Sequence, residues 1–311
     1  MTDNTPSPAA PDPRTQLIAM GALILVSCLW GSMVPVTALA LEGYDAFLLS
    51  AIRYSCGALI LIVVVAVTDP IRRPFRLPWL RIALCGIAAG LFVLMITVSL
   101  LFSDPITISA LMAAAPLVAA IMARFDSGAK IGWPVAVGIA AAVIGGVLVA
   151  IGQPGPLRLT GGETLVVVSM AVWTWYSLRT QDWLAPIGMT QLQISALSLA
   201  WGAALLWVAY AIALALGIVS IPAEWPAFKA TASMIWLTLG PTAAAITLWN
   251  VANSRVGVIV ATLTINLVPV FSVLIAVAFG FLPTPYQVIG GLTVLAGVVW
   301  MQVFQMRRTA G

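Results

Sequence analysis

The chain has 311 residues, of which 62% are hydrophobic and only 8% are charged, and its mean hydropathy is +1.09. A water-soluble domain is typically about half apolar and one-quarter charged, so this composition excludes a soluble protein and indicates an integral membrane protein. The sequence has no histidine, and its three cysteines lie far apart in apolar runs, where we expect buried thiols. No HExxH, CxxC or Ser-His-Asp arrangement exists, which argues against an enzyme, a bound metal and a cofactor.

The order of apolar runs predicts where the chain crosses the membrane. Residues 1–16 are rich in Pro, Asp and Thr, so we expect a short disordered tail and not a signal peptide. A spanning helix needs roughly 20 apolar residues, whereas the strands of an outer-membrane barrel alternate and are roughly 10 residues long. Runs of helical length predict an all-α protein with ten transmembrane helices, at about residues 17–41, 46–68, 80–103, 105–124, 131–151, 162–180, 189–216, 228–252, 255–280 and 284–306.

Basic residues predict the orientation of these helices. With a cytoplasmic N-terminus, eleven of the fourteen bases fall on the cytoplasmic side, and only Arg158 and Lys229 fall on the other. This bias follows the positive-inside rule, and an even number of spans places both termini in the cytoplasm, at the inner (plasma) membrane of a bacterium. Because the bases are scattered over loops and tails, a nucleic-acid surface is disfavoured. The partners we expect are the lipid bilayer and a small-molecule substrate, with the protein as a monomer or weak dimer.

Short internal matches indicate a duplication. Four of them occur in the same order at offsets between 143 and 153 residues. Because each unit holds an odd number of spans, five, the second unit enters the membrane from the opposite side. The prediction is therefore two inverted repeats, residues 17–151 and 162–306, which meet at a midplane site that alternating access exposes to either side. The clearest matches are Ser50-Ala51 with Ser195-Ala196, Ala115-Pro116-Leu117 with Val268-Pro269-Val270, and Gly138 and Gly145 with Gly290 and Gly297.

Several of these residues resemble a known family. Trp30-Gly31-Ser32, Ala51-Ile52-Arg53-Tyr54 and the Pro116 and Pro269 helices, followed by Gly-rich spans, are similar to the drug/metabolite transporter superfamily and its EamA-type ten-span carriers, over about residues 17–306. Leu248-Trp249-Asn250-Val251 and the Trp-rich sixth span resemble the YddG-type aromatic amino-acid exporters. The resemblance implies export of aromatic and other neutral amino acids. Many relatives carry a glutamate after the fourth and ninth spans, whereas here only an aspartate follows the fourth, which leaves a coupling role there in doubt.

Polar and aromatic side chains inside the spans are the candidate ligands. In the sixth span, Trp173, Tyr176 and Ser177 follow the i, i+3, i+4 spacing of one helix face. Trp and Tyr pair a large apolar face with one polar group, which suits a bulky substrate side chain, while Asn and Ser can bind its charged groups. The alternatives are hydroxyls bonded to their own backbone and rings that face lipid. The candidate substrate-binding residues are Trp30, Ser32, Met112, Trp173, Tyr176, Ser177, Trp249, Asn250 and Asn266.

Arg53 is the one charge that the sequence places clearly inside a span, roughly 10 Å from its start. It either binds a substrate carboxylate or has a structural role, and we favour the structural role because Arg53 belongs to the scaffold pattern of the family. No acid lies well inside a span, so the chain suits a facilitator better than a proton antiporter. A proton-coupled efflux pump for lipophilic cationic drugs is the alternative, and a membrane enzyme would need a dyad or metal set that is absent.

Prolines inside the spans are candidate hinges. Each removes an internal helix hydrogen bond and so permits a kink. Pro116 and Pro269 match between the repeats, which makes a symmetric hinge pair and a static pair of kinks equally good interpretations. The four candidates are Pro35, Pro116, Pro241 and Pro269.

Overall fold

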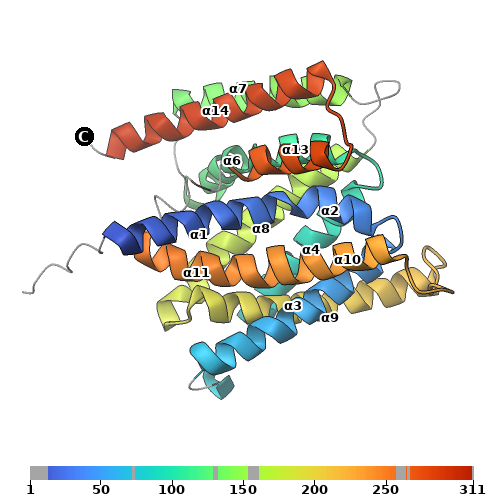
Figure 1. Ribbon diagram of the computed structural model, residues 1–311. Helices are drawn as coiled ribbons and strands as arrows, with labels where there is room; N and C mark the ends of the chain where they lie inside the picture. Colours follow the sequence, from blue (N-terminus) through green and yellow to red (C-terminus); the bar gives the residue numbers. More distant parts are fainter. Residues whose placement is uncertain are drawn as a thin grey trace, which may run out of the picture.

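The computed structural model describes residues 13–71, 74–128, 132–152, 161–256, 264 and 267–309, and within them it is all helical, with no β-strand. The expected helical class is confirmed, and the main helices run side by side in one bundle (Figure 1). The helices are α1 (Pro13–Gly31), α2 (Met33–Ala40), α3 (Ala46–Thr68), η1 (Pro74–Arg76), α4 (Trp79–Ser99), α5 (Pro105–Met112), α6 (Ala115–Ser127), α7 (Trp133–Ile151), α8 (Gly162–Trp183), η2 (Ala185–Ile187), α9 (Gln191–Ala215), α10 (Phe228–Leu237), η3 (Thr238–Ala244), α11 (Ala245–Val256), α13 (Val268–Ala278) and α14 (Pro285–Thr309).

Five helical segments of the described chain are long and apolar enough to cross a membrane. A sixth forms if α5 and α6, which are bent by 46° at their junction, count as one span. α7, α13 and α14 contain shorter apolar stretches. All of these helices fall at or near the ranges expected from the sequence, although α1 begins at Pro13, inside the expected tail. The number of ten spans stays a prediction. The five segments are 17–40, 46–68, 79–99, 191–215 and 228–249.

Capping side chains explain where several helices begin. Asp45 and Asp104 each accept hydrogen bonds from two backbone amides in the first turn of α3 and α5. At the start of α9, Thr190 and Gln193 form a reciprocal capping box. These bonds satisfy amides that have no partner within the helix, so they stabilise each turn where the chain re-enters the bundle.

Helices from the first and second halves of the chain pack against each other. α7 contacts α14, α3 contacts α9, and α4 contacts both α8 and α9. α1 contacts α11 and α13, and α5 contacts α13. Figure 1 shows α7 and α14 together at one edge of the bundle, and α1 beside α11 nearer its middle. The two halves are therefore interleaved and do not form separate bodies.

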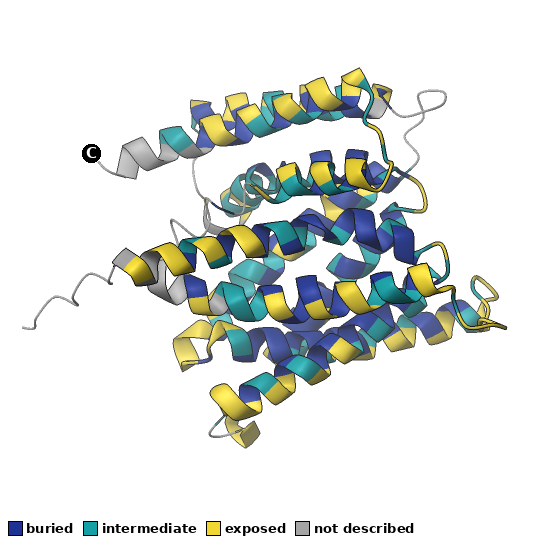
Figure 2. Cartoon of the chain, in the orientation of Figure 1, coloured by how far each residue is buried: buried dark blue, intermediate teal, exposed yellow. Residues whose placement is uncertain are grey.

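The outward faces of the bundle are apolar. Figure 2 shows exposed residues along the outer sides of the peripheral helices and buried residues between them. Large exposed side chains include Leu59 and Val63 on α3 and Leu292 on α14. A soluble protein does not carry apolar surface on this scale, whereas a lipid-facing surface does. Of the three cysteines that we expected to be buried, only Cys85 is, while Cys56 is exposed, because the apolar faces of this bundle also point outward.

Glycines allow α7 and α14 to approach closely. A Cβ added to Gly145 would lie 2.5 Å from the carbonyl oxygen of Gly290, and the converse distance is also 2.5 Å. A Cβ on Gly138 would lie 3.1 Å from the carbonyl oxygen of Gly297. Since the lower-numbered glycine of each helix faces the higher-numbered one of the other, the two helices are antiparallel. Small residues at such an interface permit the dense packing on which helix association in lipid depends.

We expect Gly145→Ala to lower the free energy of unfolding by about 1–3 kcal/mol, because the new methyl group overlaps the Gly290 carbonyl. Gly146→Ala is the matched control, since a Cβ there meets nothing closer than Leu111 Cδ2 at 3.4 Å. Thermal unfolding of the purified protein in detergent measures both. Equal melting temperatures for the two variants would contradict the close packing of α7 on α14.

Candidate functional site

The candidate site is built around η3, a π-helical segment between α10 and α11 that contains Pro241. Proline has no amide hydrogen, so the carbonyl of Leu237, four residues earlier, loses its α-helical donor. Thr242 Oγ1 donates to Leu237 O instead, at 2.9 Å. The hydroxyl thus donates to a buried carbonyl that lacks its α-helical donor. Single π-helical turns of this kind are frequent at functional sites.

Arg53 reaches η3 from α3. Its side chain is buried, and its Nε donates to Thr242 Oγ1 at 3.0 Å. α3 lies close to η3 because of Gly57, where an added Cβ would be 2.6 Å from Thr242 Cγ2. Arg53, Thr242 and Leu237 therefore form one chain of hydrogen bonds across two helices. In it the Thr242 hydroxyl is both acceptor and donor, which fixes the position of the guanidinium group.

Aromatic side chains cover the same segment from α1. Trp30 Nε1 donates to Pro241 O at 3.0 Å, and the Trp30 ring lies 5.5 Å from that of Trp249. Trp236 Nε1 donates to Ser32 Oγ at 2.9 Å, at the junction of α1 and α2. The structure thus brings together four residues that the sequence proposed separately, which are Trp30, Ser32, Pro241 and Trp249.

A second aromatic group lies on α8. The ring of Trp173 is 5.0 Å from that of Tyr176 and 4.8 Å from that of Phe92 on α4. Met112 packs against the same hydrophobic cluster as Phe92. Tyr176 is buried, whereas Trp173 is 41% exposed. Ser177 Oγ donates to the backbone oxygen of Trp173, so this hydroxyl bonds within its own helix.

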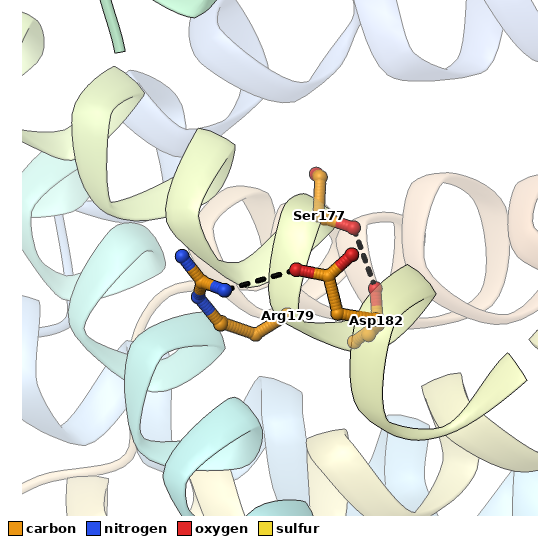
Figure 3. A network of polar contacts seen from close by, with 4 residues as sticks. Ser177, Arg179 and Asp182 are labelled. Atoms are coloured by element: carbon orange, nitrogen blue, oxygen red, sulfur yellow. Dashed lines mark hydrogen bonds and ion pairs between the residues drawn. The ribbon is translucent and has the colours of Figure 1, made fainter. Parts of the chain in front are cut away.

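Charged groups lie near the helix ends. Near the end of α8, Arg179 and Asp182 form an ion pair of 2.9 Å (Figure 3). Lys229 pairs with Glu42 at 2.8 Å, and both of these side chains are more than half exposed. Among the described residues, Arg53 is by contrast a buried cation in the middle part of its helix.

The candidate hinge prolines lie at or next to helix breaks. Pro35, Pro116 and Pro269 occupy the first turns of α2, α6 and α13. A missing amide removes no helical bond at the start of a helix. Pro241 instead lies inside a continuing helical stretch. Whether any of them moves stays a prediction.

Some proposed residues lie outside the described part, and some contacts were not foreseen. Asn266 and the side chain of Asn250 are not among the described residues. Thr242, Phe92 and Trp236 were missed as neighbours of the proposed ligands. A threonine directly after a proline inside a span was the available signal for Thr242, since its hydroxyl can bond the carbonyl that proline leaves free.

We expect Thr242→Val to lower the free energy of unfolding by about 1–3 kcal/mol, because the carbonyl of Leu237 loses a donor and the Nε of Arg53 loses its partner. Thr247→Val is the control, since that hydroxyl, within the described part of the chain, bonds only to the backbone oxygen of Ala243 in its own helical stretch. Thermal unfolding in detergent compares the two. A Thr242 variant as stable as the Thr247 variant would contradict the bonding network at η3.

Comparison with known proteins extends along nearly the whole chain. Residues 17–151 match the EamA-like transporter family. The chain is 28% identical over 296 residues to the "probable terminal-alkyne amino-acid exporter" of Streptantibioticus cattleyicolor, covering 94% of this chain and 95% of that protein. It is 24% identical over 310 residues to the "uncharacterized transporter YrdR" of Bacillus subtilis, covering 93% and 92% of the two chains.

A solved structure shares the fold. A crystal structure superposes with a TM-score of 0.65 at 19% sequence identity, covering 94% of this chain and 98% of the other. These matches confirm the resemblance to EamA-type transporters that the sequence motifs suggested, and the narrower resemblance to the YddG-type exporters stays a prediction. The chain is a multi-pass membrane protein, and it is similar to the EamA-type transporters of the drug/metabolite transporter superfamily.

Proposed function

We propose that this protein exports, or passes in both directions, small neutral metabolites across the bacterial inner membrane, and that its substrates are amino acids with bulky or aromatic side chains. The observation that carries the proposal is the aromatic group at η3, where Trp30 and Trp249 lie against a broken helix. Aromatic rings bury the large apolar side chain of such a substrate, while their polar edges bond to the protein. The name of the Streptantibioticus relative, an amino-acid exporter, supports the same substrate class.

Alternating access between two inverted repeats, residues 17–151 and 162–306, is the proposed mechanism. The contacts between helices support it. The helices that would correspond in the two repeats are α1 and α8, α3 and α9, α4 and α10–η3–α11, α6 and α13, and α7 and α14. When each helix is replaced by its counterpart, the contact between α4 and α8 becomes the contact between α11 and α1, and the structure contains both. In the same way, the contact between α6 and α8 becomes the contact between α13 and α1. The α3–α9 and α7–α14 contacts exchange with themselves. This is the pattern expected of a two-fold axis in the membrane plane.

Movement at the helix breaks is the proposed switch. Pro116 and Pro269 begin α6 and α13, which correspond in the two repeats, and α5 is bent against α6 by 46°. Bending one junction while the other straightens would open the site to one side at a time. We expect Pro116→Ala and Pro269→Ala to change transport rate and the labelling of cysteines placed in the pathway. Unchanged transport and labelling in both variants would contradict the hinge.

The position of the acids supports a facilitated mechanism without proton coupling. Asp104 caps the start of α5, and Glu163, although buried and bonded to Ser103 Oγ at 3.0 Å, lies in the first turn of α8, so both are at helix ends. In reconstituted vesicles, we expect saturable counterflow of aromatic amino acids that does not respond to a pH gradient. Transport of cationic dyes alone, driven by a pH gradient, would favour the alternative of a proton-coupled drug pump and would overturn the proposal.

We expect Trp30→Ala to raise the KM for phenylalanine by about tenfold, since a buried aromatic contact contributes roughly 1–3 kcal/mol. Trp207→Ala is the control, because Trp207 is 43% exposed on α9 and its Nε1 bonds to Ser55 on α3, away from η3. Counterflow of labelled phenylalanine measures both variants. An equal effect of the two substitutions would show that Trp30 does not line the site.

A further inference from the structure

Arg53 is a buried cation without a counter-ion among the residues that the structure describes. Its side chain is 5% exposed, and its one hydrogen bond within the described chain runs from Nε to Thr242. The adjacent buried side chain, Tyr54, is by contrast satisfied, because its hydroxyl donates to Ala89 O at 3.0 Å. An arginine kept only for structure would be expected to bond neighbouring carbonyls with its terminal nitrogens as well.

The hydrogen bond that Arg53 does make leaves a defined edge of the guanidinium group available. Nε is held by Thr242 Oγ1, which is itself bonded to Leu237 O. The two Nη groups therefore keep their donors in a fixed orientation. Two parallel donors of this kind match the two oxygens of a carboxylate, and such charge-assisted pairs are among the strongest hydrogen bonds in proteins.

The same helical turn also anchors the aromatic group. Trp30 bonds to the carbonyl of Pro241 and Arg53 bonds to the hydroxyl of Thr242, which is the next residue. An aromatic surface and an unpaired cation are thus tied to one break in the helix, from α1 and α3 respectively. An amino acid has the complementary arrangement, with its carboxylate one carbon away from its side chain.

We propose that Arg53 binds the carboxylate of the substrate, with the substrate side chain against Trp30 and Trp249. This inference rests on the proposed function and specifies its substrate: an amino acid with a free carboxylate, not an amine, amide or ester. It reverses the preference for a structural role that the sequence alone suggested. Binding also pairs a charge that is costly to leave unpaired within a membrane, so the buried position of Arg53 favours an anionic group.

Competition against labelled phenylalanine counterflow in proteoliposomes tests the assignment, with phenylalanine, phenylalaninamide and phenethylamine as unlabelled competitors. All three carry the same ring and amine, and only the first has a carboxylate. On the wild-type protein, we expect the amide and the amine to compete about 10- to 100-fold more weakly, the range for hydrogen bonds to a charged partner.

The Arg53→Met variant should lose this discrimination, because phenylalanine binding weakens to the level of its amide while amide binding stays the same. Arg53→Lys keeps the charge but not the two parallel donors of the guanidinium group, so it should retain part of the discrimination. If a variant no longer transports, ligand-induced shifts in its melting temperature in detergent give the ratio of its affinities for phenylalanine and phenylalaninamide. Arg179→Met is the control, because Arg179 pairs with Asp182 near the end of α8, and it should keep the wild-type ratio.

The outcomes separate this inference from the proposed function. Saturable exchange of phenylalanine with equal competition by its amide would overturn the carboxylate site and leave the proposed function standing. Equal weakening of both ligands in Arg53→Met would likewise assign Arg53 a structural role. If neither phenylalanine nor any other amino acid exchanges or shifts the melting temperature of the wild-type protein, both proposals fail.

Discussion

Hydrocarbon offers no hydrogen bonds to a polypeptide, so a helix that breaks inside a membrane must have its free backbone groups satisfied by the protein itself. The break at Pro241 shows how this constraint organises the bundle. The Thr242 hydroxyl donates to the carbonyl that loses its α-helical donor at Pro241, and Arg53 donates to that hydroxyl from α3. Trp30 bonds to the Pro241 carbonyl from α1. The hydrogen bonds at this break thus connect α1, α3 and η3, and they bring the polar and aromatic groups of the candidate site together.

Close backbone packing holds the rest of the bundle together. Since lipid is as apolar as the outer helix faces, burial of apolar surface contributes little to the association of helices there. Glycines on α7 and α14 let the backbones of the two helices touch, and Gly86 and Gly90 on α4 meet Gly202 on α9 in the same way. These interfaces join the first half of the chain to the second. If the two halves move as proposed, we expect the movement at the helix breaks and not by separation of these pairs.

Helix positions were largely predictable because they depend on local properties. The third helix spans 46–68, as the length of its apolar run indicated, and Asp45 caps it because an acid precedes that run. A kink near Pro116 was foreseen, but the position of the break between α5 and α6 was not, since alanines at 113 and 114 give no turn signal. A break at Pro241 was foreseen, but its π-helical form depends on Thr242 and on the approach of α3 at Gly57.

The sequence by itself determined the membrane class, the location of most helices and a set of aromatic and polar candidates, because length, composition and helical period are properties of short segments. The tertiary structure decided which candidates meet. Arg53 and its partner Thr242 are 189 residues apart, and helical period cannot distinguish a face turned to another helix from one turned to lipid, since both are apolar here. Only packing reveals that Arg53 is held at Nε alone, within the described chain, beside the turn that also anchors Trp30.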